Sequence, residues 1–446
     1  MRVSSRLLAR SVCKANIPKD SYAFDSLTLD KKLKEAYTEY YNLKKSHIAL
    51  RHTYLDNLAE ALADLHQTPK ARIIQQLKER EIQRSTARKI RYLRGKMKSG
   101  STTLISIEQP GGGTFDYIDK QDVEREILRS NEQKFKQSHH HPFYHYPPKN
   151  LFGWKGISYE SMLVLLGAYN STKYIPTREA DLLLALQRPE NIHLLSNGKM
   201  TISLPVYRHF WHKAKETTSC YPDALLFTTM KAGARSDLIS DIECKLAKVS
   251  IKSSYSPLCW KKCLDVMILK KSGLTTIKSL RTVVLFPVDC NFVFKNLGRK
   301  LMKNVEAATV LAPEQFGSHK HHRASALATN KALTYDLMRQ LKCRGAMCSN
   351  DAKSCYDLIG HTQASLAMQR MGIPQASVDC MVTTLQEAIH RERTGYGGSS
   401  CYYGGKVWAI PIKGIGQGNG AGPAIWAVVS TPLLNILKVG LYGTYL

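Results

Sequence analysis

The sequence predicts an α+β fold on the basis of two helical patterns and one hairpin pattern. Leucines recur at three- and four-residue spacing from Leu55 to Leu65, and at four-residue spacing from Leu333 to Leu341. Such spacing places apolar side chains on one face of a helix. In contrast, Val266–Leu269 and Leu280–Phe286 are short apolar runs on either side of Gly273, which is the pattern of two strands joined by a turn.

The chain length allows two or three domains, since 446 residues is several times the size of a small domain. Composition divides it into a basic helical region at 1–110, a linker and helical connecting region at 111–256, and a third region at 257–446. The glycine run Gly111–Gly113 ends the first region and has the character of a turn or linker. No stretch approaches 18 consecutive apolar residues, so we expect no segment that spans a membrane.

The charge of the chain points to a polyanionic partner. It has 64 Lys and Arg residues against 36 acidic residues, a net charge of +28. The cations concentrate between Lys70 and Lys98, where phosphate contact and a solvated helix face are both open and phosphate contact is favoured. A second cluster, His319–Arg323, suits a nucleic-acid backbone. The candidate nucleic-acid-binding residues are Lys70, Arg72, Arg84, Arg88, Lys89, Arg91, Arg94, Lys320 and Arg323.

The connecting region and the segment after the hairpin are predicted to be mostly helical. Lys134–Lys149, rich in histidine and proline, is predicted to be a surface connection without a metal site, because no cysteine or acid completes a ligand set. The helices are expected after Leu29, near Ser158, after Thr177, from Trp211 to Glu216, at 298–308, at 324–341, from Thr362 to Gly372 and from Pro374.

Cysteine usage suggests an intracellular protein, nuclear or cytoplasmic. The eleven cysteines are scattered and odd in number, with no secretory signal ahead of them, so we expect reduced thiols. The first 19 residues contain five cations and no acid. That composition suits a mitochondrial presequence, and it equally suits the start of a piece of a longer protein, which we favour.

The hairpin pattern places three cations together. Lys270 and Lys271 fall at the predicted turn, and Arg281 lies on the returning strand. Lysine ammonium groups and a bidentate guanidinium could bind a triphosphate there. The alternative is an exposed hairpin whose lysines are solvated.

The stretch Ser349–Asp357 contains the candidate catalytic residue. It follows the small apolar run Gly345–Cys348, so we expect a strand that ends near Asp351. Two-metal nucleotide transfer needs a carboxylate on a rigid element, and Mg²⁺ prefers such oxygen ligands. The aromatic Tyr356 follows five residues later. The alternative for this string is a capping aspartate and a buried tyrosine.

A glycine-rich stretch, Gly414–Trp426, follows two predicted short strands with glycine turns and a third predicted strand at Val407–Ile412. Gly416, Gly418 and Ala421 have the spacing of a dinucleotide-binding fingerprint. That fingerprint requires an acid about 20 residues further on for the ribose. Glu392 is the last acid in the chain, so a dinucleotide-binding site is excluded.

These motifs, in this order and spacing, resemble the reverse transcriptases of non-LTR retrotransposons. The resemblance covers the chain from about Pro257 to its end, which is similar to the fingers and front palm. It rests on the cationic hairpin, on Leu311–Gly317 with its E-Q-x-G pattern, on the D-A-x-x-C-Y-D string at 351–357, and on G-x-G-Q-G-N-G-A-G-P at 414–423. The basic region before residue 150 also resembles the segment that precedes the polymerase in these elements.

The resemblance implies RNA-directed DNA synthesis with an RNA template, a DNA primer, deoxynucleoside triphosphates and Mg²⁺. Asp351 would be the first metal-binding aspartate, and Tyr356 the aromatic gate that excludes a 2′-hydroxyl. Gln417 and Gly418 would form the turn of the nucleotide and template pocket, with Pro423 downstream. The implied nucleotide-binding residues are Lys270, Lys271, Arg281, Tyr356, Gln417 and Gly418.

The chain departs from the family pattern in one respect. These enzymes carry a second acidic motif, an Asp-Asp pair, a few dozen residues past the Q-G turn, and this chain has no Asp-Asp pair. We therefore expect the N-terminal part of a right-hand polymerase, with fingers and a partial palm but no thumb, that is inactive alone. The alternative is a catalytically dead, nucleic-acid-binding relic of such an element.

Overall fold

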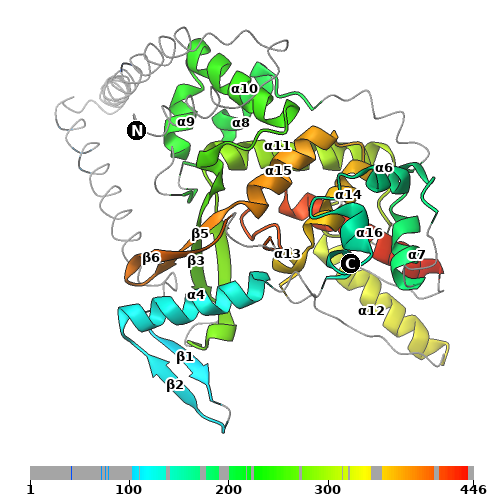
Figure 1. Cartoon of the computed structure of the whole chain (residues 1–446), viewed down its shortest axis with the longest axis horizontal. Helices are drawn as coiled ribbons and strands as arrows, with labels where there is room; N and C mark the ends of the chain where they lie inside the picture. Colours follow the sequence, from blue (N-terminus) through cyan, green and yellow to red (C-terminus); the bar gives the residue numbers. More distant parts are fainter. Residues whose placement is uncertain are drawn as a thin grey trace.

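The computed structural model describes four isolated helical residues and most of the chain after residue 102 (Figure 1). Predictions that fall on other residues, including most of the helix expected from Leu29 to Arg94, lie outside this part. The described residues are 42, 72, 76, 79, 103–109, 111–136, 141–170, 177–189, 200–216, 218–221, 226–270, 274–313, 315–319, 322–342, 354–405 and 411–439.

The described part of the chain is α+β, with two small sheets and many helices. One sheet is the antiparallel hairpin of β1 (Ile105–Glu108) and β2 (Thr114–Tyr117). The other has four strands in the order β4, β3, β5, β6. Its strands are β3 (Lys262–Leu269), β4 (Leu280–Leu285), β5 (Ile389–Thr394) and β6 (Gly397–Gly404).

The larger sheet confirms both predicted hairpins and adds a pairing between them. β3 and β4 pair antiparallel, with Leu264 opposite Leu285, and β5 and β6 pair antiparallel around the turn at Gly397. β3 and β5 run parallel and join segments that are far apart in the sequence. The strand predicted at 407–412 lies mostly outside the described residues, and its last two, Pro411 and Ile412, are not in a strand.

Helix α4 (Lys120–Lys136) lies against the larger sheet, next to β5 and β6 (Figure 1). Val123 and Ile127 on this helix pack in one cluster with Met267 of β3. The prediction of a surface connection at 134–149 is therefore wrong, because its start belongs to α4 and the aromatic rings of Phe143 and Tyr144 are buried. Histidine and proline content did not reveal those two buried rings.

A buried polar network lies between α4 and the sheet. Asp265 and Glu392 are direct partners across β3 and β5, and both are fully buried. His390 Nδ1 lies 3.0 Å from Asp265 Oδ1, and the Tyr403 hydroxyl donates to the other oxygen of Asp265. The Asn131 amide of α4 donates to Glu392 Oε1 at 2.9 Å. Two carboxyl groups so close in a dry site cannot both be charged cheaply, so burial and Asp265 raise the pKa of Glu392 to about 9.

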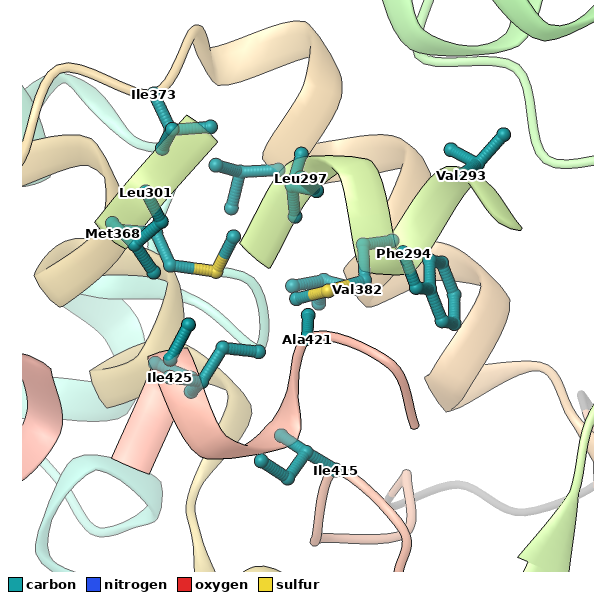
Figure 2. Packing of buried hydrophobic residues seen from close by; sticks show 14 of the residues in the cluster. Val293, Phe294, Leu297, Leu301, Met368, Ile373, Val382, Ile415, Ala421 and Ile425 are labelled. Carbon is teal, nitrogen blue, oxygen red and sulfur yellow. The ribbon is translucent and has the colours of Figure 1, made fainter. Parts of the chain in front are cut away.

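Most of the helices surround one extended core, to which Cys263 of β3 and Val284 of β4 also belong. The central helix, α11 (Val288–Ala307), directs Val293, Phe294, Leu297 and Leu301 into this core (Figure 2). The other helices of eight or more residues in the described part are α6 (Tyr159–Leu166), α7 (Thr177–Ala185), α8 (Leu204–Lys213), α10 (Asp237–Lys252), α12 (Ala324–Gln340), α14 (His361–Arg370), α15 (Gln375–Gln386) and α16 (Gly422–Val439).

The core contains side chains from both sides of the boundary predicted at residue 256. Phe210 and Trp211 of α8 form edge-to-face pairs and a tilted stack with Phe292 of α11. In the same core, Ile415, Ala421 and Ile425 lie beneath α11 (Figure 2). The domain division remains a prediction, although the connecting region and the third region share this packing.

Most predicted helices are confirmed in the described part, with one error of position. Ser158 caps α6 by accepting from the Ser161 backbone N–H, as expected of a serine at a helix start. However, α8 starts at Leu204 and ends at Lys213, so Trp211 lies in its last turn and does not open a helix. Pro205, which favours the first turn of a helix, gave the better signal.

Helix α12 extends away from the rest of the described structure (Figure 1). Its predicted leucine row is present, yet Leu333, Leu337 and Leu341 remain 60%, 56% and 63% exposed. None of the helices in the described part combines the length and apolar character that crossing a bilayer requires.

Candidate nucleotide and nucleic-acid site

The β3–β4 hairpin positions two of the three predicted triphosphate ligands. Lys270 follows β3, and its backbone N–H donates to Ser279 O at 3.0 Å, which closes the hairpin end. Arg281 lies opposite Ile268 on β4 and is exposed. Neither cation has a carboxylate within ion-pair distance among the described residues. Lys271 lies outside the described residues.

The glycine-rich stretch forms a turn against the free edge of β4. The Val284 backbone N–H donates to Gln417 O at 2.7 Å, at an edge of β4 that no other strand of the described part occupies. Gly418 has φ +124°, and a Cβ there would lie 2.2 Å from Val284 O. Only glycine permits this approach and this backbone conformation. Arg281 lies three residues before Val284 on the same strand, about 10 Å from the point where the turn meets β4.

The side chain of Asn419 fixes the shape of the turn. Its amide nitrogen donates to Ile415 O at 3.0 Å, and its amide oxygen accepts from the Ala421 N–H at 2.9 Å. The next residue, Gly420, donates its N–H to Asn291 Oδ1 of α11 at 2.8 Å. The turn is therefore held by α11 as well as by β4.

Tyr356 lies beside this turn on the short helix α13 (Cys355–Leu358). Its carbonyl accepts from the Ile415 N–H at 2.8 Å, and a Cβ on Gly422 would lie 3.6 Å from its ring. The ring is half-buried, and burial raises the pKa of its hydroxyl. Tyr356 is therefore not the wholly buried tyrosine that the sequence left open as an alternative.

Asp357 is buried next to Tyr356 and is already occupied by other groups. Lys134 Nζ of α4 lies 2.5 Å from its Oδ2, and the Gln417 amide donates to the same oxygen at 3.3 Å. Burial raises the pKa of Asp357, and the Lys134 charge partly opposes this. Both contacts go to Oδ2, and the buried Oδ1 has no hydrogen-bond partner among the described residues. The ion pair with Lys134 makes Asp357 a weak candidate for binding magnesium.

The predicted catalytic and metal-binding residue, Asp351, lies outside the described residues. Within the described ranges, no group of three or more His, Cys, Asp or Glu side chains could hold a metal ion. The residues described around the turn thus do not supply a magnesium site, and the assignment of Mg²⁺ to Asp351 stays a prediction.

The predicted nucleic-acid-binding residues are described at only two positions. Arg72 is helical and exposed, and Arg323 is the exposed residue before the first turn of α12. The remaining candidates lie outside the described residues and stay predictions: Lys70, Arg84, Arg88, Lys89, Arg91, Arg94 and Lys320.

Sequence reasoning missed two contributions to this site. Lys134 was placed in a surface connection, and nothing in its neighbourhood signalled a buried aspartate as its partner. The second is a row of cations on α11 next to the turn, at Lys295, Arg299 and Lys303. Their four-residue spacing is visible in the sequence and would have indicated one helix face.

Comparison with known proteins adds no family assignment. No protein-family model matches the chain, and no curated protein matches it. The functional argument therefore rests on the motifs and on the geometry around the glycine-rich turn.

Proposed function

We propose that residues 257–446 are the nucleotide-binding part of an RNA-directed DNA polymerase of the non-LTR retrotransposon type. The observation that carries the proposal is the convergence of three segments to which the motifs assign nucleotide roles. Gln417 bonds to β4 of the cationic hairpin, its amide reaches Asp357, and the neighbouring Tyr356 packs on the end of the same turn. These segments are far apart in the sequence, so their meeting supports a shared site.

In the proposed reaction, a primer 3′-oxygen attacks the α-phosphate of a deoxynucleoside triphosphate, and pyrophosphate leaves. Lys270 and Arg281 would bind the triphosphate, since both are exposed cations without an acidic partner among the described residues. The half-buried ring of Tyr356 would lie under the sugar and occupy the space that a 2′-hydroxyl needs. The glycine at 418 would hold Gln417 against the hairpin, because only glycine permits the close approach of this turn to β4.

A binding experiment tests the proposal on the full chain. Labelled dTTP and UTP are titrated onto the protein with a primer annealed to an RNA template, in MgCl₂. Arg281→Gln should weaken the binding of both nucleotides about tenfold or more, because a charge-assisted contact to phosphate contributes roughly 1.5–3 kcal/mol. Lys262→Gln is the matched control, since Lys262 is an exposed cation at the opposite end of β3 from Lys270.

The sugar role of Tyr356 is tested in the same assay. Tyr356→Ala should bring the affinity for UTP close to that for dTTP, whereas Tyr356→Phe keeps the ring and should preserve the parent's preference. If the parent and both variants bind the two nucleotides equally, Tyr356 is only a packed aromatic. If Arg281→Gln also has no effect, the polymerase proposal fails and a relic that binds nucleic acid alone remains.

A further inference from the structure

Helix α11 carries a row of cations on the face opposite its core face. Lys295, Arg299 and Lys303 are all exposed and follow one another at four-residue spacing. In an α-helix this spacing places successive side chains on one face, about 6 Å apart along the axis. None of the three has a carboxylate partner among the described residues. A row of like charges without counter-charges is destabilising by itself, so an anionic partner would relieve it.

Two of these cations are held in place by an aromatic ring. Lys295 Nζ lies 5.6 Å and Arg299 Cζ 5.2 Å from the centroid of Phe210 on α8. Phe210 is itself buried, with Trp211 and Phe292 packed on it. Partial burial and the charge of Arg299 lower the pKa of Lys295. Both charged groups therefore have a cation–π contact without any ligand, and such a contact reduces the entropy lost when a ligand binds.

The row starts at the glycine-rich turn. Asn291, one helical turn before Lys295, accepts the hydrogen bond from Gly420 N–H. A Cβ on Gly420 would lie 2.7 Å from Lys295 Cβ, so the turn backbone and the base of the first cation are in contact. The row therefore extends from the turn that contains Gln417 along the surface of α11.

We propose that Lys295, Arg299 and Lys303 bind consecutive phosphates of a single nucleic-acid strand that runs into the turn at Gln417 and Gly418. A single row of cations on one helix matches one strand, and it offers ammonium and guanidinium groups but no donor–acceptor pattern for reading bases. Binding should thus be independent of sequence. That this strand is the RNA template rests on the proposed function, whereas the phosphate contacts rest on the geometry alone.

The test measures the salt dependence of RNA binding by the full chain. A fluorescein-labelled single-stranded RNA of mixed sequence is titrated at several salt concentrations between 50 and 200 mM. Each phosphate contact contributes about 0.7 to the log–log slope for a single strand, so the triple variant K295Q/R299Q/K303Q should lower the slope by about 2. Over this fourfold salt range, the parent should lose about 16-fold more affinity than the triple variant.

Two further variants make the test specific. The triple variant K120Q/K252Q/K342Q removes the same charge from three exposed lysines on other parts of the surface and should leave the slope within one unit of the parent value. Phe210→Leu keeps an apolar side chain but removes the ring, so it should weaken RNA binding severalfold with the three charges intact. Circular dichroism melting curves confirm that each variant is folded.

The possible outcomes separate this proposal from the proposed function. Equal slope losses in the two triple variants would overturn it, because only net charge would matter. Poly-glutamate serves as a second probe, for an acidic protein partner. If K295Q/R299Q/K303Q loses poly-glutamate binding but keeps RNA binding, the proposal is overturned and an acidic protein partner is indicated. If Tyr356→Ala does not change the preference for dTTP over UTP, but K295Q/R299Q/K303Q still lowers the salt slope of RNA binding, the phosphate contacts on α11 stand and only the polymerase proposal is rejected.

Discussion

Helices α11 and α12 have similar lengths and similar leucine spacing, yet α11 is largely buried and α12 is exposed. Eleven of the 20 residues of α11 are buried, whereas none of the 17 residues of α12 is. Both contain leucines at four-residue spacing: Leu297 and Leu301 in α11, Leu333 and Leu337 in α12. The pattern therefore predicts which face of a helix is apolar, but it does not predict what covers that face.

The difference arises from segments distant in sequence. The apolar face of α11 meets Ile415, Ala421 and Ile425 from the C-terminal part of the described chain (Figure 2). Gly298 makes this approach possible, since a Cβ there would lie 2.9 Å from the Ala421 Cα. No comparable covering segment contacts α12 within the described part of the chain.

The largest expected difference between the helices is the effect of deleting a leucine side chain. Leu301→Ala should lower the free energy of unfolding by about 2–5 kcal/mol, because it opens a cavity in a packed core. Leu337→Ala should change it by less than about 0.5 kcal/mol, because an exposed leucine loses little burial. Urea unfolding followed by circular dichroism measures both.

Equal losses of unfolding free energy in Leu301→Ala and Leu337→Ala would contradict the difference in burial between the two helices. In that case α12 must have a partner in solution that buries its leucine row. Sedimentation of the parent chain would then show whether that partner is a second copy.

A smaller difference in unfolding free energy is expected when an asparagine of each helix is replaced by alanine. The buried Asn304 amide of α11 donates to Met371 O at 2.9 Å, so Asn304→Ala leaves a buried carbonyl without this donor and should cost about 1–3 kcal/mol. Asn330 of α12 is the matched position, and Asn330→Ala should be neutral or slightly stabilising, since alanine has the higher helix propensity. Thermal melts of both variants would show the contrast, and an equal loss at Asn330 would contradict it.

The smallest expected effect is on the pH dependence of stability, and it compares one acidic residue packed under α4 with one on α12. Glu392, buried under α4, has its pKa raised to about 9 by burial and by Asp265. Asp336 of α12 is exposed beside Arg339. The charged form of Glu392 is therefore disfavoured in the folded protein. The groups that face Glu392 are Asp265 on β3, and Asn131, Glu124 and Glu132 on α4.

The sign of the pH dependence follows from proton binding. Between the ordinary glutamate pKa of 4.5 and about 9, folded Glu392 keeps a proton that the unfolded chain releases. Stability from this group is thus present at low pH and is lost as the pH rises through about 9, by roughly 1 kcal/mol per pH unit. Unfolding measured from pH 7 to 9 should depend less on pH in Glu392→Gln than in the parent. The exposed control Asp336→Asn should show the same pH dependence of unfolding free energy as the parent. If Glu392→Gln also shows the parent's pH dependence, Glu392 is not a buried, neutral acid.

Local sequence patterns predicted much of the sheet and part of the site. The β3–β4 hairpin, the turn at Gly397 and most of the helices follow from alternation, periodicity and glycine placement. The motifs also indicated that Tyr356 and Gln417 belong together, and the structure brings them to the same turn. The hairpin and helix predictions were confirmed because each depends on a few consecutive residues, whereas the nucleotide roles of Tyr356 and Gln417 stay predictions.

Contacts between distant segments could not be predicted in the same way. Nothing around Lys134 indicates that it pairs with the buried Asp357, and Phe210 gives no sign that it will hold Lys295 and Arg299. The parallel pairing of β3 with β5 was also missed. Each of these contacts depends on tertiary packing, which local propensity and spacing do not specify.

That parallel pairing has a consequence for the timing of synthesis. Leu264 of β3 is paired with Arg391 of β5, which follows 127 residues later in the chain. At about 5–20 residues per second, a ribosome needs roughly 6–25 s to make the partner strand. During this interval the inner edge of β3 is free to pair with a strand of another nascent chain. For the sheet to close on itself, β3 must therefore stay unpaired with other chains throughout this interval.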